Sequence, residues 1–257
     1  MEEKSKYWLL NDLCHKTKVT PLQTFFLQQA IRAYFADLGE SLQIPFPYDI
    51  KNKFVYRARL NENFVFEKKG DLLCPPVGQT KLGRANFPNQ PIFYCAENPD
   101  VAIAEIKIPN KDCFVTVGQF RIKEDVKLSL KSLGLHKTER YNIEGASNDL
   151  IDVENVLMEL FTQNAEDNAE LYSKTATVTS TVLEENSYHG IIYPSIQTEF
   201  KGDCIAIRPE LIQQHFELTE VKLFEVRINP TTQKSHFKER LYALNFDDER
   251  ITWLFKE

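Results

Sequence analysis

The first forty residues carry a helical pattern of apolar positions. Thr20 and Pro21 are typical of a helix start, with Thr as the N-cap and Pro at the first helical position, and Gly39 is a typical end. The apolar residues between them recur at helical spacing: Leu22, Phe25, Phe26, Ala30, Ala33, Tyr34 and Leu38. The pattern predicts a helix with a wide apolar stripe. This stripe packs on its own domain, or it is a docking surface for a partner protein or a second copy in a homodimer.

Beyond the stretch 44–47, which contains two prolines and interrupts the helical pattern, short runs of apolar or alternating residues predict strands. The expected strands are 53–60, 91–96, 113–120, 191–193 and 204–207, and further strands at 221–227, 240–244 and 251–255 are expected to add antiparallel to a sheet. Helices are expected after Asn98-Pro99 and over 151–161 and 172–183. Strands and helices interleave without a regular βαβ period, which predicts an α+β fold of mixed, mainly antiparallel sheets with flanking helices. We expect a helical extension at 1–50 and a main domain at 51–257.

Composition and charge narrow the classes of function. The 257 residues include 31 Lys and Arg against 37 Asp and Glu, a net charge of −6, which disfavours bulk nucleic-acid binding. The five cysteines and five histidines are scattered, so neither a disulfide framework nor a metal site is expected. The first apolar run, 7–10, is too short for a signal peptide or a membrane span. These features predict a cytoplasmic protein with reduced thiols.

Several polar residues stand beside the apolar runs. Arg84 and Asn86 precede the expected strand at 91–96, Tyr94 lies within it, and Glu105 follows 11 residues after Tyr94. Ser195 comes just after the expected strand at 191–193. Nucleotide-binding, hydrolase and metalloprotease motifs are absent from the sequence.

In this order the residues resemble the RES domain family. The first half of the resemblance is Tyr56-Arg57-x-Arg59, Gly83-Arg84-x-Asn86, Pro91-Ile92-Phe93-Tyr94-x-Ala96 and Ala102-x-Ala104-Glu105, and the second half is 172–175 and 189–195. The resemblance spans about 54–208, and the family's name comes from an Arg, a Glu and a Ser that match Arg84, Glu105 and Ser195. It implies a RES-like catalytic domain with the C-terminal strands of 218–257 added to it. One departure is Gly202-Asp203, where the family usually has Gly-Asn.

The resemblance implies a fold similar to the ADP-ribosyltransferase toxins. It also implies a toxin of a bacterial toxin–antitoxin or defence system that depletes NAD by glycohydrolysis or phosphorolysis. NAD is then the substrate, no resident cofactor is needed, and the expected partner is an antitoxin with a helix-turn-helix domain.

The residue types suit this chemistry. Cleavage of the nicotinamide–ribose bond develops positive charge at the ribose, and nicotinamide leaves as a neutral ring without protonation. One carboxylate near the ribose can stabilise that charge, and Glu105 is the candidate; the alternative is a solvated residue paired with Lys107 or Lys111. Arg84 is the candidate for the pyrophosphate, or else a surface arginine in a loop.

Arg57 and Arg59 form a second candidate set, because alternate residues of a strand share one face. One of them is expected to contact phosphate or to pair with Glu105. Tyr94 could stack on the nicotinamide or bind the ribose, and the alternative is a buried tyrosine with a satisfied hydroxyl.

Ser195 is expected to orient the substrate by a hydrogen bond, with a simple turn residue as the alternative, and His189 is expected to be structural. Asn86 and Tyr193 complete the substrate-binding candidates. Two other classes of function stay open: a mono-ADP-ribosyltransferase acting on a macromolecule, and a non-catalytic protein that binds NAD or ADP-ribose.

Overall fold

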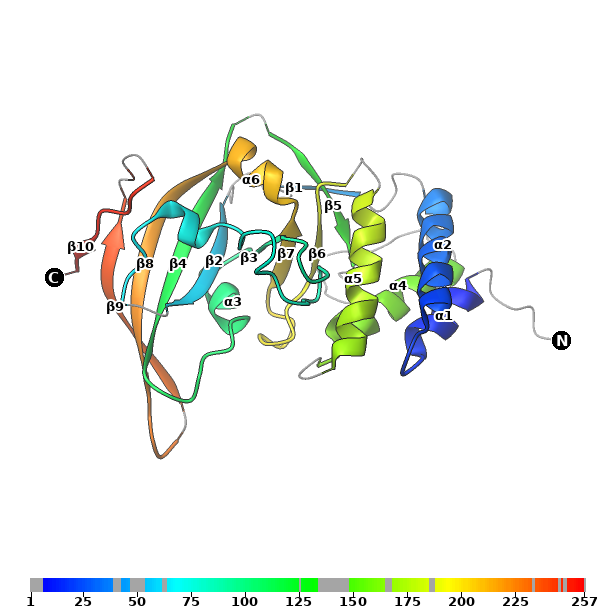
Figure 1. Cartoon of the computed structure of the whole chain (residues 1–257), viewed down its shortest axis with the longest axis horizontal. Helices are drawn as coiled ribbons and strands as arrows, with labels where there is room; N and C mark the ends of the chain where they lie inside the picture. Colours follow the sequence, from blue (N-terminus) through cyan, green and yellow to red (C-terminus); the bar gives the residue numbers. More distant parts are fainter. Residues whose placement is uncertain are drawn as a thin grey trace. The chain divides into compact units, whose positions relative to one another are not determined.

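The computed structural model describes residues 7–38, 43–46, 54–61, 64–124, 126–133, 148–164, 168–184, 188–232, 234–244, 246 and 249–256. The chain forms two compact units (Figure 1). Unit 1 comprises residues 1–48, 76–92 and 127–201, and unit 2 comprises 49–75, 93–126 and 202–257.

Unit 1 contains most of the helices. Its sheet runs in the order β1 (Gln43–Phe46), β5 (Leu128–Ser132) and β6 (Gly190–Pro194), with β1–β5 antiparallel and β5–β6 parallel. Every residue of β6 is buried, as its continuous apolar sequence predicts. The helices are α1 (Trp8–His15), α2 (Pro21–Leu38), α4 (Asn148–Thr162) and α5 (Ala169–Glu184).

The start of α2 is fixed by a reciprocal cap. The Gln23 amide N–H donates to Thr20 Oγ1 at 3.3 Å, and the Thr20 amide N–H donates to Gln23 Oε1 at 2.9 Å. The predicted start of this helix is therefore confirmed. The inner face of α2 is buried and the helix packs on α5, whereas Leu22 and Phe25 are 63% and 52% exposed.

A buried polar cluster ties α2 to the rest of unit 1. The Tyr34 hydroxyl donates to Glu154 Oε1 at 2.6 Å, and Lys131 Nζ lies 3.3 Å from the same oxygen. Lys131 also lies over the Phe35 ring, 5.0 Å from its centroid. The N-terminal helical region therefore packs within unit 1, on strand β5 and helix α4.

Unit 2 contains an antiparallel sheet in the order β7, β3, β2, β4, β8, β9, β10. The strands are β2 (Phe54–Asn61), β3 (Phe93–Ala96), β4 (Cys113–Ile122), β7 (Asp203–Ile207), β8 (Phe216–Ile228), β9 (Ser235–Ala243) and β10 (Leu254–Phe255). A 3₁₀ turn, η1 (Lys69–Leu72), and two short helices, α3 (Pro99–Ala104) and α6 (Pro209–His215), accompany it. Figure 1 shows β4, β8 and β9 as long neighbouring strands.

The α+β class, the mainly antiparallel pairing and the helical N-terminus are confirmed. Three local expectations were wrong or incomplete. Residues 43–46 form β1 instead of only interrupting the helical pattern, the last strand is limited to Leu254–Phe255, and β5 and α6 had no counterpart in the predicted elements. The predictions for Gly39 and Pro47 lie outside the described residues.

Candidate functional site

The predicted site residues fall in both units. Arg57, Arg59, Tyr94 and Glu105 belong to unit 2, and Arg84, Asn86, Tyr193 and Ser195 belong to unit 1. Each unit therefore supplies half of the set.

Arg57 lies in the middle of β2 and is buried. One of its terminal nitrogens donates to the Tyr94 carbonyl oxygen at 2.6 Å, and the guanidinium lies 5.2 Å from the centroid of the Phe93 ring. Its Nε has no hydrogen-bond partner among the described residues. Burial, followed by the neighbouring charge of Arg59, lowers the pKa of Arg57 from 12.5 to about 10. With a pKa of about 10, the Arg57 guanidinium remains positively charged at neutral pH. Its hydrogen bond to the Tyr94 carbonyl oxygen links β2 to the main chain of β3.

Arg59 shares the Arg57 face of the strand, as predicted. Its guanidinium donates to the Asp71 carbonyl oxygen and lies over the Phe66 ring, 5.8 Å from the centroid. Tyr56 pairs with Ala96 across β2 and β3, so the alternation of side chains places Tyr94 on the Tyr56 face. The two arginines and the Tyr94 ring therefore point to opposite faces of the sheet.

Glu105 follows the last residue of α3 and is exposed to solvent. Its amide N–H donates to the Val101 carbonyl oxygen at 3.1 Å, which keeps the residue in helical geometry. At the other end of α3, Asn98 Oδ1 accepts from the Val101 amide at 2.9 Å, as the Asn98-Pro99 sequence predicts. The carboxylate is thus carried on a capped helix and remains accessible to a ligand.

The segment before β7 packs closely against the start of α3. A Cβ atom at Gly202 would lie 2.4 Å from Val101 Cγ2 and 3.1 Å from Glu97 Oε1, so a larger residue here would force the Val101 side chain or the backbone to shift. The following Asp203 is buried, and its carbonyl oxygen accepts from the Glu97 amide at 3.2 Å. The Gly202-Asp203 departure therefore lies where β7 meets the turn that starts α3.

In unit 1, Arg84 lies in the tight turn between Gly83 and Asn86. Its terminal nitrogens donate to the carbonyl oxygens of Phe161 at 2.6 Å and Gln163 at 3.1 Å, at the C-terminal end of α4. Its guanidinium also lies over the Tyr172 ring, 5.7 Å from the centroid. The Arg84 side chain therefore connects this turn to the end of α4 by hydrogen bonds and to α5 by its contact with Tyr172. A guanidinium has five N–H donors, and these two bonds leave others for a ligand.

Asn86 stabilises the same turn. Its side-chain amide donates to the carbonyl oxygens of Lys81 at 2.9 Å and Phe87 at 2.8 Å, and the residue is buried. These bonds use the amide nitrogen within the loop, so Asn86 shapes the turn that carries Arg84.

Ser195 follows β6 directly and is wholly buried. Its Oγ accepts from the Thr198 amide at 3.3 Å, and its carbonyl oxygen accepts from the Phe200 amide at 2.8 Å. Glu199 and Phe200 have φ angles of 53° and 65°, a left-handed conformation that is uncommon for residues other than glycine. Such backbone is characteristic of loops held in a defined shape by their surroundings.

Tyr193, two residues before Ser195, is also buried, and its ring packs on Phe161 with the centroids 5.5 Å apart. His189 Nδ1 accepts from the Ser129 amide at 2.8 Å, which gives the ring a bond to the neighbouring strand β5. The described residues contain no group of three or more His, Cys, Asp or Glu side chains placed to hold a metal ion. No helix in the described part of the chain is long and apolar enough to cross a membrane.

The chain is therefore an α+β protein with a mainly antiparallel sheet. Its candidate site residues include three arginines, an exposed glutamate and a buried serine. The RES domain family model matches residues 55–224, and the chain belongs to the RES domain family. The match includes all eight predicted site residues. No curated protein matches the chain.

Sequence reasoning missed the groups that hold the site residues in place. The carbonyls of Tyr94, Asp71, Phe161 and Gln163 accept from the arginines. Every residue has a carbonyl, so the sequence contains no signal for which one a distant arginine will reach.

Proposed function

We propose that this protein is an NAD-degrading enzyme that cleaves the nicotinamide–ribose bond, with water or phosphate as the acceptor. The observation that carries the proposal is the RES domain match over residues 55–224, which contains every predicted site residue. The local geometry of Glu105 supports it, because an exposed carboxylate at the end of a capped helix is accessible to a substrate.

In this proposal Glu105 stabilises the positive charge that develops on the ribose and holds a ribose hydroxyl. A carboxylate fixed in advance stabilises the transition state more than the neutral ground state, which is the requirement for catalysis. The leaving nicotinamide needs no proton, so a single carboxylate is sufficient.

The arginines have different local surroundings. Arg84 keeps donors beyond its two carbonyl bonds and is the proposed contact for the pyrophosphate. Arg57 and Arg59 are bound to main-chain carbonyls, and Arg57 is buried. We assign these two to positioning: Arg57 holds the main chain of Tyr94, the residue proposed to stack on nicotinamide.

Ser195 has no exposed surface, so its proposed role is to set the shape of the loop at 195–200. Asn86 shapes the turn that bears Arg84, and Tyr193 packs beneath the end of α4. In this proposal these three residues do not contact the substrate. They hold the turn of Arg84, the loop at 195–200 and the end of α4 in place.

Incubation of the purified protein with NAD, with and without phosphate, tests the proposal when released nicotinamide is measured by chromatography. Glu105→Gln is expected to lower kcat by about a hundredfold or more, since it removes the charge and keeps the shape. Glu67→Gln is the matched control, because Glu67 is an exposed carboxylate of unit 2 outside the predicted site. Wild-type turnover in Glu105→Gln would contradict its assigned role.

The fate of the ADP-ribose distinguishes the related functions. NAD labelled in the adenosine part yields free ADP-ribose or its 1-phosphate under the proposed reaction. Label transferred to a macromolecule would identify a mono-ADP-ribosyltransferase instead. NAD binding without turnover in any condition would identify a non-catalytic binding protein.

We further propose that NAD loss makes the protein a growth-inhibiting toxin with a cognate antitoxin. Induced expression in a bacterial host is expected to arrest growth and lower cellular NAD, and Glu105→Gln is expected to do neither at equal expression. Growth arrest by the variant at undiminished NAD would separate toxicity from this activity.

A further inference from the structure

The helices α1 and α2 lie before residue 55, where the RES domain match begins. Within unit 1, α1 packs on α4 and α2 packs on α5 (Figure 1). The same two helices hold Arg84, which donates to carbonyl oxygens at the end of α4 and lies over the Tyr172 ring of α5. The N-terminal region and the proposed pyrophosphate contact therefore share their two supports.

Lys174 of α5 binds the end of α1. The residue is only 5% exposed, and its Nζ donates to the Cys14 carbonyl oxygen at 2.9 Å and also to the Lys16 carbonyl oxygen. Both carbonyls stand at the C-terminal end of α1, where they have no partner within the helix and where the helix dipole favours a cation. A buried ammonium group is costly without hydrogen-bond partners, so these bonds fix the Lys174 side chain at the end of α1.

Glu170, one helical turn before Lys174, binds the segment between α1 and α2. Its Oε1 accepts from the Val19 amide at 2.6 Å. Residues four positions apart share one face of a helix, so Glu170 and Lys174 lie on the same face of α5. Together they attach residues 14–19 to the first turns of this helix.

Tyr172 lies between these two residues in the sequence and on the opposite side of the helix, because two residues correspond to about 200° of rotation. The Arg84 guanidinium lies over the Tyr172 ring, 5.7 Å from its centroid. A planar guanidinium stacks favourably on an aromatic face. The N-terminal end of α5 is thus bound to residues 14–19 on one side and to Arg84 on the other.

The N-terminal helices also bind α4, the helix that supplies the carbonyl acceptors of Arg84. The Tyr34 hydroxyl of α2 donates to Glu154 Oε1 at 2.6 Å, and His15 Nε2 of α1 lies 3.3 Å from Glu159 Oε2. Both supports of Arg84 are therefore attached to helices that lie outside the family match.

We propose that the N-terminal helices are a positioning element for Arg84, with Lys174 and Glu170 as the positioning residues. These two residues fix the N-terminal end of α5 and with it the Tyr172 ring, which sets the direction of the Arg84 guanidinium. The inference rests on the proposed contact between Arg84 and the pyrophosphate of NAD. The RES domain of this chain then depends on a segment outside the family match for the geometry of one substrate-binding arginine.

Kinetics of the Lys174→Met variant test this role, because methionine keeps the length of the side chain and lacks its donors. We expect KM for NAD to rise about two- to tenfold, as for the loss of one hydrogen bond, and kcat to change less than about twofold. In an Arg84→Gln background the same substitution is expected to have no further effect on KM, because the arginine through which it acts is absent. An unchanged KM in Lys174→Met, or equal effects in the two backgrounds, would overturn the proposal.

Glu170 allows a conservative rescue. Glu170→Ala removes the acceptor of the Val19 amide and is expected to raise KM in the same way, whereas Glu170→Gln keeps an acceptor oxygen and is expected to retain the wild-type KM. Because Glu170 is only half-buried, this pair tests the proposal even where Lys174→Met lowers stability. Equal KM values for the two Glu170 variants would contradict the assigned contact.

Chemical labelling of Arg84 tests the positioning without NAD. Phenylglyoxal modifies guanidinium groups, and mass spectrometry of the Arg84 peptide measures the rate. Release of the side chain in Lys174→Met is expected to raise this rate about two- to tenfold, by the same reasoning as for KM. An unchanged rate would overturn the proposal. Faster labelling in a protein that does not turn over NAD would contradict the proposed function and support the positioning of Arg84.

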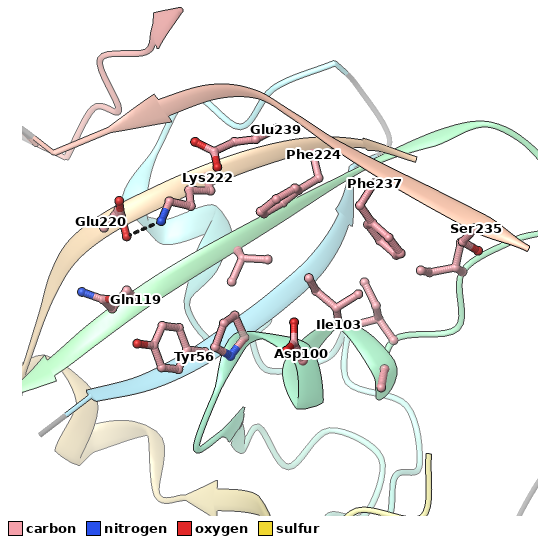
Figure 2. Close-up of a pocket in the computed structure, with 15 residues that line it drawn as sticks. Tyr56, Asp100, Ile103, Gln119, Glu220, Lys222, Phe224, Ser235, Phe237 and Glu239 are labelled. Atoms are coloured by element: carbon pink, nitrogen blue, oxygen red, sulfur yellow. Dashed lines mark ion pairs between the residues drawn. The ribbon is translucent and has the colours of Figure 1, made fainter. Parts of the chain in front are cut away.

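Two control variants separate positioning from a general loss of stability. Val182→Ala leaves a cavity at the other end of α5, and Val182 is buried. Lys222→Met makes the same exchange in unit 2, where Figure 2 shows Lys222 paired with Glu220, at 2.9 Å, beside a groove of about 720 Å³. Both variants are expected to label at Arg84 like the wild type. Labelling in Val182→Ala as fast as in Lys174→Met would overturn the proposal.

Discussion

Gly202 shows at the scale of one residue how the candidate site depends on close packing. The position has no room for a Cβ, because Val101 of α3 lies against it. Glu105, the proposed catalytic residue, follows the last residue of the same helix. The close packing at Gly202 therefore lies against the first turn of the short helix that Glu105 follows.

We expect Gly202→Ala to lower the free energy of unfolding by about 1–3 kcal/mol, the usual cost of overpacking in a tight site. Adding Val101→Ala removes the atom 2.4 Å from the new Cβ and should recover part of this loss relative to Val101→Ala alone. Gly70→Ala is the control, because a Cβ at Gly70 would meet no atom within 4 Å. Denaturant unfolding measures each variant against the wild type, and equal stability of Gly202→Ala and the wild type would contradict the packing argument.

At the scale of the element, α2 is held by a polar cluster as well as by its apolar face. Tyr34, Glu154 and Lys131 come from α2, α4 and β5, and all three are buried. Burial and the adjacent Glu154 carboxylate raise the pKa of Tyr34 far above its ordinary value of 10, whereas burial is the largest influence on Lys131 and lowers its pKa.

This cluster predicts a pH-dependent contribution to stability. In the unfolded chain Tyr34 loses its proton near pH 10, whereas in the folded protein it keeps the proton, so the unfolded state binds fewer protons above pH 10 and stability falls. Tyr34→Phe should cost about 1 kcal/mol at pH 7 through the lost hydrogen bond. The difference between wild type and variant should shrink as the pH rises above 10. Urea unfolding at about pH 7 and about pH 10.5 measures this, and an unchanged difference would contradict the assigned proton.

Local sequence signals predicted the helix starts, because the residues that form a cap lie next to one another in the sequence. The Thr20-Pro21 start of α2 and the Asn98-Pro99 start of α3 were predicted because a cap depends on neighbouring residues. Strand β1 was missed, because a strand containing Pro45 is recognised by its pairing with β5 and not by its own residues. Arg57 and Arg84 were candidates from the sequence, but the sequence did not predict that they donate to carbonyl oxygens 37 and 77 residues away.

At the scale of the whole molecule, the five cysteines are free thiols distributed over both units. Burial raises the pKa of Cys14 to about 12 and is also the largest cause that raises the pKa of Cys74, to about 11. The thiolate is the reactive form, so these groups are unreactive at neutral pH in the folded protein.

We expect five thiols per chain to react with a disulfide reagent in denaturant and the Tm to be the same with and without reductant. In the folded protein at about pH 8, Cys14 should react about a thousandfold more slowly than in the unfolded chain, from its thiolate fraction alone. Mass spectrometry of the labelled peptides identifies each site. Fewer than five reactive thiols in denaturant would reveal a disulfide and contradict this assignment.

The sequence by itself determined the α+β class, the helical N-terminus, the candidate residues and the resemblance to the RES domain family. Periodicity and caps depend on residues close together in the sequence, and motif order depends on the sequence alone. Only the tertiary structure decided which groups hold those candidates. Arg57 and Arg84 bind distant carbonyls, Gly202 is fixed by contact with α3, and Glu105 remains exposed at a helix end. The net charge of −6 is likewise a property of the sequence, but the pairing of each carboxylate with its cation is not. Such contacts join residues far apart in the chain, and their energies depend on burial and distance, which exist only once the chain has folded.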